Sequence, residues 1–188
     1  MNELTHPSNS LGADLRALRK SRGITLEDMA ASLDRSVGWL SQVERDLSAP
    51  SIDDLHKMAK ILDVPISLFF GDAHAPEQER GYVVRAKGRR AIGSADGLTE
   101  SLLSPDLTDD FEVIHSVFAP GAGSKKPISR DTQEVATLIK GALRVWIGDK
   151  RFDLVTGDSF RVRGEAYRWE NAHSEPAIAI WVISPPVY

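Results

Sequence analysis

The sequence predicts two domains, an all-α bundle of five short helices followed by an all-β barrel. The chain of 188 residues is long for one ordinary domain and sufficient for two small ones. Apolar residues recur at helical spacing through residues 1–70, and beyond residue 80 short β-rich runs alternate with turn residues. We therefore place a helical domain at residues 1–70, a linker at 71–80 and a β domain at 81–188.

The predicted helices are short and closely connected. Leu11, Leu15 and Leu18 lie on one face of the first helix, which ends at Gly23. Pro65 opens the fifth, a short turn. The N-cap residues that open the second, third and fourth helices are Thr25, Ser36 and Ser51. The apolar residues expected to pack inside these three helices are Leu26, Met29, Ala30, Leu33, Leu40, Val43, Ile52, Leu55, Ala59 and Leu62.

Runs rich in β-branched and aromatic residues follow the linker, separated by turn pieces such as PGAG, GDK and TGD. Many short strands at this spacing are typical of an all-β barrel or sandwich. The expected strands cover residues 82–85, 111–118, 135–139, 142–147, 158–163, 167–170 and 177–183.

Composition excludes several classes of protein. The absence of cysteine excludes disulfide scaffolds, thiolate zinc sites and cysteine nucleophiles. The sequence shows neither the apolar core of a signal peptide nor an apolar run of membrane-spanning length, so we expect a cytoplasmic protein. Residues 1–72 carry 8 Lys and Arg against 11 Asp and Glu, and residues 73–188 carry 15 against 16. Neither half is basic, so a nucleic-acid surface must be local.

The second and third helices, joined by a tight turn through Leu33–Arg35, form a candidate helix-turn-helix. The run LSQVER at residues 40–45 is followed by Pro50-Ser51 and by a helix with apolar residues at regular positions. Over residues 15–70 this pattern closely resembles the lambda-repressor-like, or XRE, helix-turn-helix domain. The resemblance implies a five-helix domain that binds double-stranded DNA.

The resemblance also implies roles for individual residues. In that fold the third helix enters the major groove and reads base edges. Gln42 can bond an adenine edge and Val37 can contact a thymine methyl group. The residues expected to read bases are Val37, Gly38, Ser41 and Gln42. The residues expected to contact phosphates are Arg16, Lys20, Arg22, Arg35 and Arg45.

Arg19 and Glu44 are charged residues at positions that point into the bundle. Arg19 follows Leu15 by four residues and Glu44 follows Leu40 by four, so each continues an apolar stripe. An unpaired charge inside the bundle would be very costly. We therefore expect Arg19 and Glu44 to pair, as the corresponding residues do in the resembled family, in a structural role.

The second half keeps a motif frame that is marked by Pro120-Gly121, Glu134, Gly141, Gly157-Asp158 and Asn171. With this frame, residues 110–184 resemble the cupin superfamily, a double-stranded β-helix or jelly-roll barrel. The family's histidines are replaced, by residues within 127–130 and by Tyr167. A cupin metal site combines several imidazoles with one carboxylate. Because Glu134 alone remains, we expect no metal and no cofactor.

The barrel interior is expected to hold polar residues beside aromatic ones, with Trp181 among the latter. Buried polar groups must pair with one another or with a ligand. An arginine such as Arg130 can hold a carboxylate through two parallel hydrogen bonds, which favours a small organic effector. The alternative is a closed Arg130–Glu134 pair in a filled core. The residues of the expected effector pocket are Arg130, Glu134, Tyr167, His115, Trp146 and Trp169.

These features predict a bacterial-type transcriptional regulator and not an enzyme. One domain of this size reads too few base pairs to be selective, so we expect a homodimer, or a higher oligomer, on palindromic operator DNA. We expect the β domain at 81–188 both to sense the small molecule and to supply the dimer contact. Two alternatives stay open. The first is a cupin enzyme fused to a DNA-binding module, which a bound metal or substrate turnover would favour. The second is a constitutive DNA-binding protein with an inert dimerisation barrel, whose DNA binding no metabolite would alter.

Overall fold

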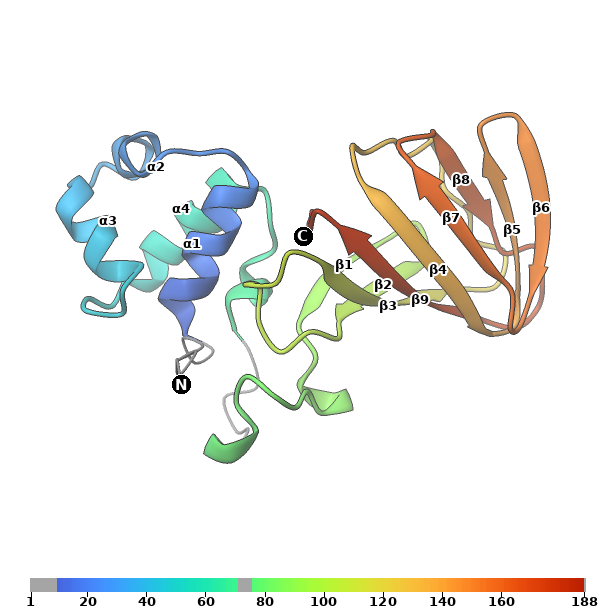
Figure 1. Cartoon of the computed structure of the whole chain (residues 1–188), viewed down its shortest axis with the longest axis horizontal. Helices are drawn as coiled ribbons and strands as arrows, with labels where there is room; N and C mark the ends of the chain where they lie inside the picture. The colour runs from blue at the N-terminus through green and yellow to red at the C-terminus, as the bar shows by residue number, and fades with distance from the viewer. Residues whose placement is uncertain (1–9, 71–75, 188) are drawn as a thin grey trace, which may run out of the picture. The chain divides into compact units, whose positions relative to one another are not determined.

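The computed structural model describes residues 10–70 and 76–187, and the chain divides into two compact units. The helical unit runs to Arg90 and includes Pro105–Asp109, and the sheet unit contains Ala91–Ser104 and Asp110–Val187 (Figure 1). Residues 71–75 of the predicted linker lie outside the described residues. The segment Pro105–Asp109 therefore belongs to the helical unit, although its neighbours in the sequence belong to the sheet unit.

The described part of the helical unit begins with four α-helices and a 3-10 helix. They are α1 (Leu11–Ser21), α2 (Leu26–Ser32), α3 (Val37–Val43), α4 (Ile52–Leu62) and η1 (Ile66–Phe69). Each α-helix begins after a residue whose hydroxyl accepts a backbone hydrogen bond: Ser10, Thr25, Ser36 and Ser51. The predicted fifth helix is a 3-10 turn, Ile66–Phe69, and the backbone is extended again at Phe70. No described helix has the length and hydropathy that crossing a bilayer requires.

The apolar faces of the helices meet in one core. Ile52, which the sequence places inside this core, is instead exposed. It is the first residue of α4, and the packed face of that helix begins one turn later. The buried apolar residues are Leu15, Leu18, Met29, Ala30, Leu33, Leu40, Val43, Leu55, Met58, Ala59, Leu62, Val64, Leu68 and Phe69.

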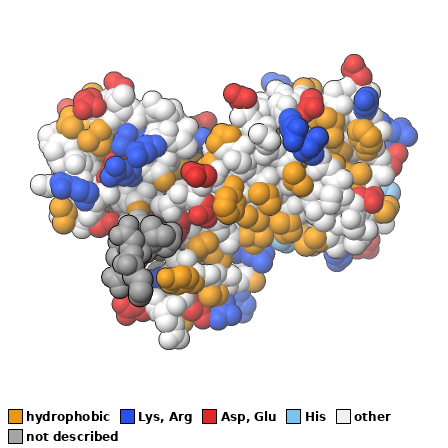
Figure 2. All heavy atoms as spheres, viewed as in Figure 1, with side chains coloured by type: hydrophobic (Ala, Val, Ile, Leu, Met, Phe, Trp, Pro, Cys, Tyr) orange, Lys and Arg blue, Asp and Glu red, His pale blue; other side chains and the backbone are white. Residues whose placement is uncertain are grey.

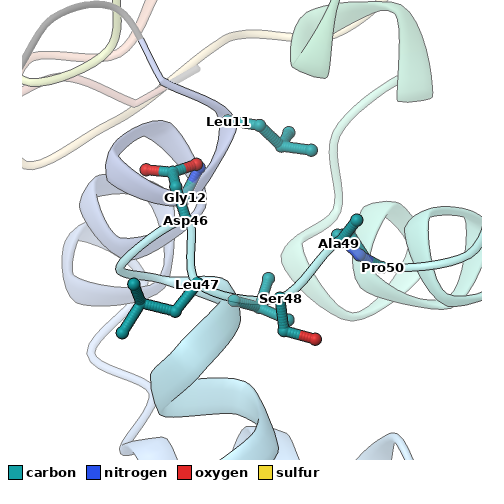
Figure 3. Close-up of a pocket in the computed structure, with 8 residues that line it drawn as sticks. Leu11, Gly12, Asp46, Leu47, Ser48, Ala49 and Pro50 are labelled. Atoms are coloured by element: carbon teal, nitrogen blue, oxygen red, sulfur yellow. The ribbon is translucent and has the colours of Figure 1, made fainter.

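Gly12 lies where α1 meets the segment that follows α3. A Cβ atom here would overlap the Val43 carbonyl oxygen and would lie 2.9 Å from the Glu44 carbonyl carbon. The Gly12 N–H donates to Oδ1 of Asp46 at 2.9 Å, and Figure 3 shows the two residues side by side. A pocket of about 240 Å³ adjoins them, lined also by Leu11, Val43, Leu47, Ser48, Ala49 and Pro50. Only glycine permits the two backbones to approach this closely.

Gly12→Ala is expected to lower the free energy of unfolding by about 1–3 kcal/mol, since the atoms that clash are backbone and cannot rotate away. Gly38→Ala in α3 is the matched control, because nothing lies within 4 Å of the added Cβ. Alanine is the better helix former by up to about 1 kcal/mol, so the control should be slightly more stable than wild type. Thermal melts followed by circular dichroism measure both. A wild-type melting temperature for Gly12→Ala would contradict this packing.

Two antiparallel sheets form the sheet unit (Figure 1). Among the described residues, the larger sheet has the order β1-β2-β3-β9-β4-β7 and the smaller has the order β6-β5-β8. Inward side chains of both sheets share one core, which is the predicted all-β architecture. The strands are β1 (Ala91–Ala95), β2 (Leu98–Leu102), β3 (Glu112–Phe118), β4 (Gln133–Lys140), β5 (Ala142–Ile147), β6 (Lys150–Val155), β7 (Ser159–Arg163), β8 (Tyr167–Glu170) and β9 (Ala177–Ser184).

The strand predicted at residues 82–85 is wrong, and β1, β2 and β6 are not predicted. Residues 82–85 lie between two 3-10 turns, and the Val83 N–H donates to the Glu79 carbonyl oxygen at 2.8 Å. These β-branched residues have no neighbouring strand to pair with, and strand propensity depends on such packing. β1 and β2 form a hairpin over Asp96-Gly97, whose two positive φ angles are those that an Asp-Gly turn favours.

Alternation along the strands sends side chains to an inner and an outer face of each sheet. The inner face is strongly aromatic. Phe118 and Trp169 meet edge to face with ring centres 4.7 Å apart, and Phe160 and Trp181 meet at 5.2 Å. The buried carboxylate of Glu134 therefore lies in an apolar interior.

Candidate DNA interface and barrel site

The accessible side of α3 is the candidate DNA-reading surface. Two buried side chains, Leu40 and Val43, anchor the helix in the helical core, and Ser36 caps its start. The opposite side of the helix is accessible, as a helix that enters a DNA groove requires. The four residues predicted to read bases are exposed or half-buried on that side: Val37, Gly38, Ser41 and Gln42.

An ion pair joins α1 to Glu44, the residue that follows α3. Arg19 Nε donates to Glu44 Oε1 at 2.6 Å, and Nη2 donates to Oε2 at 3.0 Å. Arg19 Nη1 donates to the Ile24 carbonyl oxygen at 2.8 Å. The hydrogen bond to Glu44 raises the pKa of Arg19 above its ordinary value. Both side chains are buried, so the pair positions the end of α3 within its own unit.

Arg35, predicted to contact a phosphate, is engaged inside the helical unit. Its Nε and Nη2 donate to the two carboxylate oxygens of Asp54 at 3.1 Å each. Its guanidinium also lies 5.0 Å from the centre of the Trp39 ring. Hydrogen bonds from Ser51 and, to a smaller extent, from Arg35 lower the pKa of Asp54. Arg35 thus ties the turn between α2 and α3 to the start of α4, and Nη1 takes no part in this pair.

The other four predicted phosphate contacts differ in how they are held. Arg16 and Lys20 lie one turn apart on the exposed side of α1. Arg45 is exposed, and its Nε donates to the Ser41 carbonyl oxygen at 3.1 Å. Arg22 is half-buried, and its Nε donates to a carbonyl oxygen at the end of α4 at 2.9 Å. Arg16, Lys20 and Arg45 are therefore more accessible than Arg22.

Glu134 places a carboxylate inside the barrel with 1% of its surface exposed. Its Oε1 accepts from the Thr132 hydroxyl at 2.7 Å, and among the described residues its Oε2 has no hydrogen-bond partner. The same holds for the buried Nε1 of Trp181. Burial and then the nearby Glu134 charge raise the pKa of Tyr167, which keeps its phenol protonated. The barrel residues thus include a buried acceptor atom and a buried donor atom that make no hydrogen bond within the described part of the chain.

Three of the predicted pocket residues share the barrel interior: Glu134, Tyr167 and Trp169. Arg130 is exposed in the segment before β4, and its positive charge opposes the rise in the pKa of Tyr167. Glu134 is hydrogen-bonded to Thr132 and not to Arg130. Thr132 is a residue that the sequence analysis misses. Its position two residues before Glu134, on the same side of an extended chain, is the signal that marks it.

His115 and Trp146, also predicted in the pocket, lie on the outer faces of the two sheets. His115 alternates with buried neighbours along β3. Trp146 alternates with the buried Val145 on β5, and the Arg168 guanidinium lies 4.2 Å from its ring centre. Because successive side chains on a strand point to opposite faces, neither residue joins Glu134.

The position at which the resembled family holds a metal does not fit a divalent ion in this chain. Among the described residues, no three His, Asp or Glu side chains gather in a way that would hold a metal ion. Around Glu134 stand the Thr132 hydroxyl and the Tyr167 phenol, with the Arg130 cation nearby. Divalent metals of cupin sites prefer imidazole nitrogen and carboxylate oxygen. The donor set here is suited to hydrogen bonding with an organic group.

Comparisons with known proteins match both parts of the chain. Family models described as a helix-turn-helix domain and a cupin domain match residues 10–69 and 114–183. The HTH-type transcriptional regulator PuuR of Escherichia coli is 23% identical over 154 residues, covering 80% of this chain and 81% of PuuR. The transcriptional regulator ClgR of Mycobacterium tuberculosis is 32% identical over 97 residues, covering 50% of this chain and 87% of ClgR. A crystal structure of an HTH_3 family transcriptional regulator from Vibrio cholerae is 23% identical and has a TM-score of 0.43, covering 94% of this chain and 95% of that one.

Proposed function

Because the chain belongs to the XRE-type helix-turn-helix transcriptional regulators and carries a cupin domain, we propose that a small molecule in its barrel controls its binding to operator DNA. The single observation that carries the DNA-binding role is the accessible side of α3. This helix is held at its start by the Ser36 cap and near its end by the Arg19–Glu44 pair. A rigid helix with a free side is what major-groove reading requires.

In this proposal the residues of α3 read bases and cations around it contact phosphates. Gln42 bonds an adenine edge, and Val37 meets a thymine methyl group. Arg35 uses Nη1, because its other donors are taken by Asp54. Phosphate contacts add affinity without sequence information. The remaining proposed contacts are Gly38 and Ser41 to bases, and Arg16, Lys20, Arg22 and Arg45 to phosphates.

Gln42→Ala is expected to weaken specific operator binding by about 1–3 kcal/mol and to leave binding to random DNA nearly unchanged. The reason is the loss of a base contact with no loss of positive charge. Gln133→Ala, an exposed glutamine on β4, is the matched control. Competition binding with operator and random duplexes at fixed salt measures the difference. Equal discrimination by Gln42→Ala and wild type would show that α3 does not read bases as proposed.

We propose that two copies of the chain act together on a palindromic operator. A single helix-turn-helix covers one half-site, and two copies on a two-fold axis cover both halves. The helical unit has no large positive excess, so non-specific attraction to phosphates contributes little. Selectivity against genomic DNA therefore depends on doubling the number of base contacts. A cytoplasmic location follows from this role.

The effector we propose is a small organic acid that also carries an N–H or O–H donor. The donor would reach Glu134 Oε2, and an acceptor on the same molecule would reach Trp181 Nε1, and each of these buried atoms has no hydrogen-bond partner among the described residues. Arg130 would hold the carboxylate from outside the core. In this proposal the barrel senses the molecule and does not transform it.

Glu134→Gln is expected to reduce the amount of small molecule that co-purifies with the protein by at least about 10-fold, since a charge-assisted hydrogen bond is lost. Glu170→Gln, at an exposed carboxylate at the end of β8, is the matched control and should retain the molecule. Native mass spectrometry of freshly purified full-length protein measures both. Retention by Glu134→Gln would contradict the pocket assignment. A wild-type protein without any bound molecule would favour the inert barrel, and a chemically altered molecule would favour the enzyme.

A further inference from the structure

Trp39 is the aromatic residue of α3, and neither the base contacts nor the phosphate contacts proposed above use it. It is the third residue of the helix and is half-buried. The guanidinium carbon of Arg35 lies 5.0 Å from the centre of its ring. A cation at this distance over a ring is attracted by the π electrons. The contact spans the Ser36 cap, so it joins the turn before α3 to the first turn of the helix.

Asp54 holds the same guanidinium along one edge. Arg35 Nε and Nη2 donate to its two carboxylate oxygens at 3.1 Å each. Asp54 is itself fixed, because it is 3% exposed and accepts from the N–H and the hydroxyl of Ser51 at 3.1 Å and 2.6 Å. A guanidinium can bind a carboxylate with its edge and an aromatic ring with its face at the same time. Asp54 therefore fixes the position of the group, and the Trp39 ring fixes its tilt.

Arg35 keeps one nitrogen, Nη1, that makes no hydrogen bond within the described part of the chain. This nitrogen carries two N–H donors. The Arg35 side chain is 46% exposed, although the carboxylate that it binds is buried. Arg35 directly precedes the Ser36 cap, at the end of α3 where Val37 is 40% exposed. Phosphate oxygens line a groove that a recognition helix enters, so a suitable acceptor lies beside Arg35 when α3 is in the groove.

Positive charge on the helical unit is sparse, which makes the orientation of each cation important. Residues 1–72, which include the four α-helices, carry 8 Lys and Arg against 11 Asp and Glu. Figure 2 shows the Lys and Arg side chains on the visible face of this unit in small separate patches. A broad basic surface would attract DNA whatever the orientation of its side chains. Each phosphate contact here depends instead on a donor that is already oriented.

We propose that Trp39 is a positioning residue, which holds Arg35 so that Nη1 donates to one phosphate of the bound DNA. The ring and Asp54 fix the guanidinium before DNA arrives, so the freedom of the long arginine side chain is lost on folding and not on binding. Trp39 itself touches no base. A phosphate contact adds affinity for every sequence, so Trp39 contributes to affinity and not to discrimination. The inference rests on the proposed function, because only DNA binding brings a phosphate beside Arg35.

Trp39→Leu is the variant that tests this role, and it should weaken DNA binding about 10-fold because the phosphate contact is no longer held. The loss should be the same for a random duplex and for an operator duplex that the wild type selects from a random pool. Trp39→Phe keeps an aromatic ring and should bind within about 2-fold of wild type. Trp146→Leu is the matched control, since it removes a ring 4.2 Å from the Arg168 guanidinium in the sheet unit and should not alter binding. Fluorescence anisotropy of labelled duplexes with the full chain measures each dissociation constant.

A double-mutant cycle separates positioning from simple packing. Arg35→Gln should lower the slope of log affinity against log salt by about 1, because one phosphate contact is lost. In the Arg35→Gln background, Trp39→Leu should have no further effect, since the ring has no guanidinium to hold. A ring that only packs would give losses that add. If Trp39→Leu loses its cooperative melt, Trp39→Met replaces it with the same expected result.

Each other outcome overturns the inference in a recognisable way. Wild-type affinity in Trp39→Leu, equal losses in Trp39→Leu and Trp39→Phe, or additive losses in the cycle would each remove the positioning role and leave the proposed DNA binding intact. A loss confined to the operator duplex, with random DNA bound as before, would show that the ring reads a base instead. A wild-type chain that binds neither duplex would contradict the proposed function, and the inference would fall with it.

Discussion

Asp14→Ala is expected to lower the free energy of unfolding of the helical unit by about 3–5 kcal/mol, because it removes a buried carboxylate that bonds a buried arginine and a buried backbone N–H. Asp14 lies on α1 with 1% of its surface exposed, and its Oδ2 accepts from Arg90 Nη1 at 2.6 Å. Its Oδ1 accepts from the Leu107 N–H at 3.0 Å. Both partners belong to the helical unit, and Leu107 lies in the segment Pro105–Asp109. One carboxylate thus holds two distant parts of the chain.

Two further variants separate the contributions at Asp14. Asp14→Asn removes the charge but keeps an oxygen for the Leu107 N–H, so its effect should be smaller than that of Asp14→Ala. The double variant Asp14→Leu with Arg90→Met removes both charges and should also cost less than the single change. Thermal melts of the full chain give the stabilities, and hydrogen exchange at Leu107 reports the local bond. A melting temperature for Asp14→Ala within 1 °C of wild type would show that the cluster does not stabilise the unit.

Glu44→Ala is expected to cost about 3–5 kcal/mol of stability as well, since the buried Arg19 loses both of its hydrogen bonds to a carboxylate and keeps the one to the Ile24 carbonyl oxygen. Operator binding should fall with it, because the pair holds the end of α3. Arg19 donates to both oxygens of Glu44, and both side chains are buried. The same melts measure the loss of stability. Operator titrations below the melting temperature measure the loss of binding.

Two controls accompany Glu44→Ala: a change at an exposed glutamate, and a double variant that removes both members of the ion pair. Glu77→Ala changes an exposed glutamate outside the four α-helices and should leave the melt within about 0.5 kcal/mol of wild type. Arg19→Met with Glu44→Leu replaces the pair by apolar side chains of similar size and should recover much of the lost stability. No recovery in the double variant would show that the pair specifies the packing geometry itself.

Local signals predicted most of the helical unit. Thr25, Ser36 and Ser51 begin helices as predicted because a hydroxyl at such a position satisfies a backbone N–H of the first turn, whatever the rest of the chain does. The spacing of Arg19 and Glu44 predicted two inward charges, and the structure pairs them. The two-domain architecture, helical and then β-rich, is also confirmed, because it too depends on a local signal. Helical and strand periods differ and are visible in a short window.

Pairing between strands was the less predictable part of the fold. Residues 82–85 have strand composition but no partner strand, whereas β1 has small residues and pairs through the Asp96-Gly97 turn. The Asp-Gly signal was present in the sequence and would have marked that hairpin. The face of His115 could not be decided, because alternation gives relative directions and only the packed sheet decides which direction is inward. Trp146 faces outward for the same reason.

By itself the sequence determined the two domain types, the helix starts, the frame of the DNA-binding helices and the loss of imidazole ligands from the barrel. These depend on residue identity and on spacing within a few turns or strands. Only the tertiary structure decided that Asp14 binds Arg90 and Leu107 and that Glu134 pairs with Thr132. Such contacts join residues whose separation along the chain carries no periodic signal. The geometry of these contacts depends on how whole helices and strands pack. A buried charge pairs with whichever group the packing brings near it, and a strand pairs with whichever strand lies beside it.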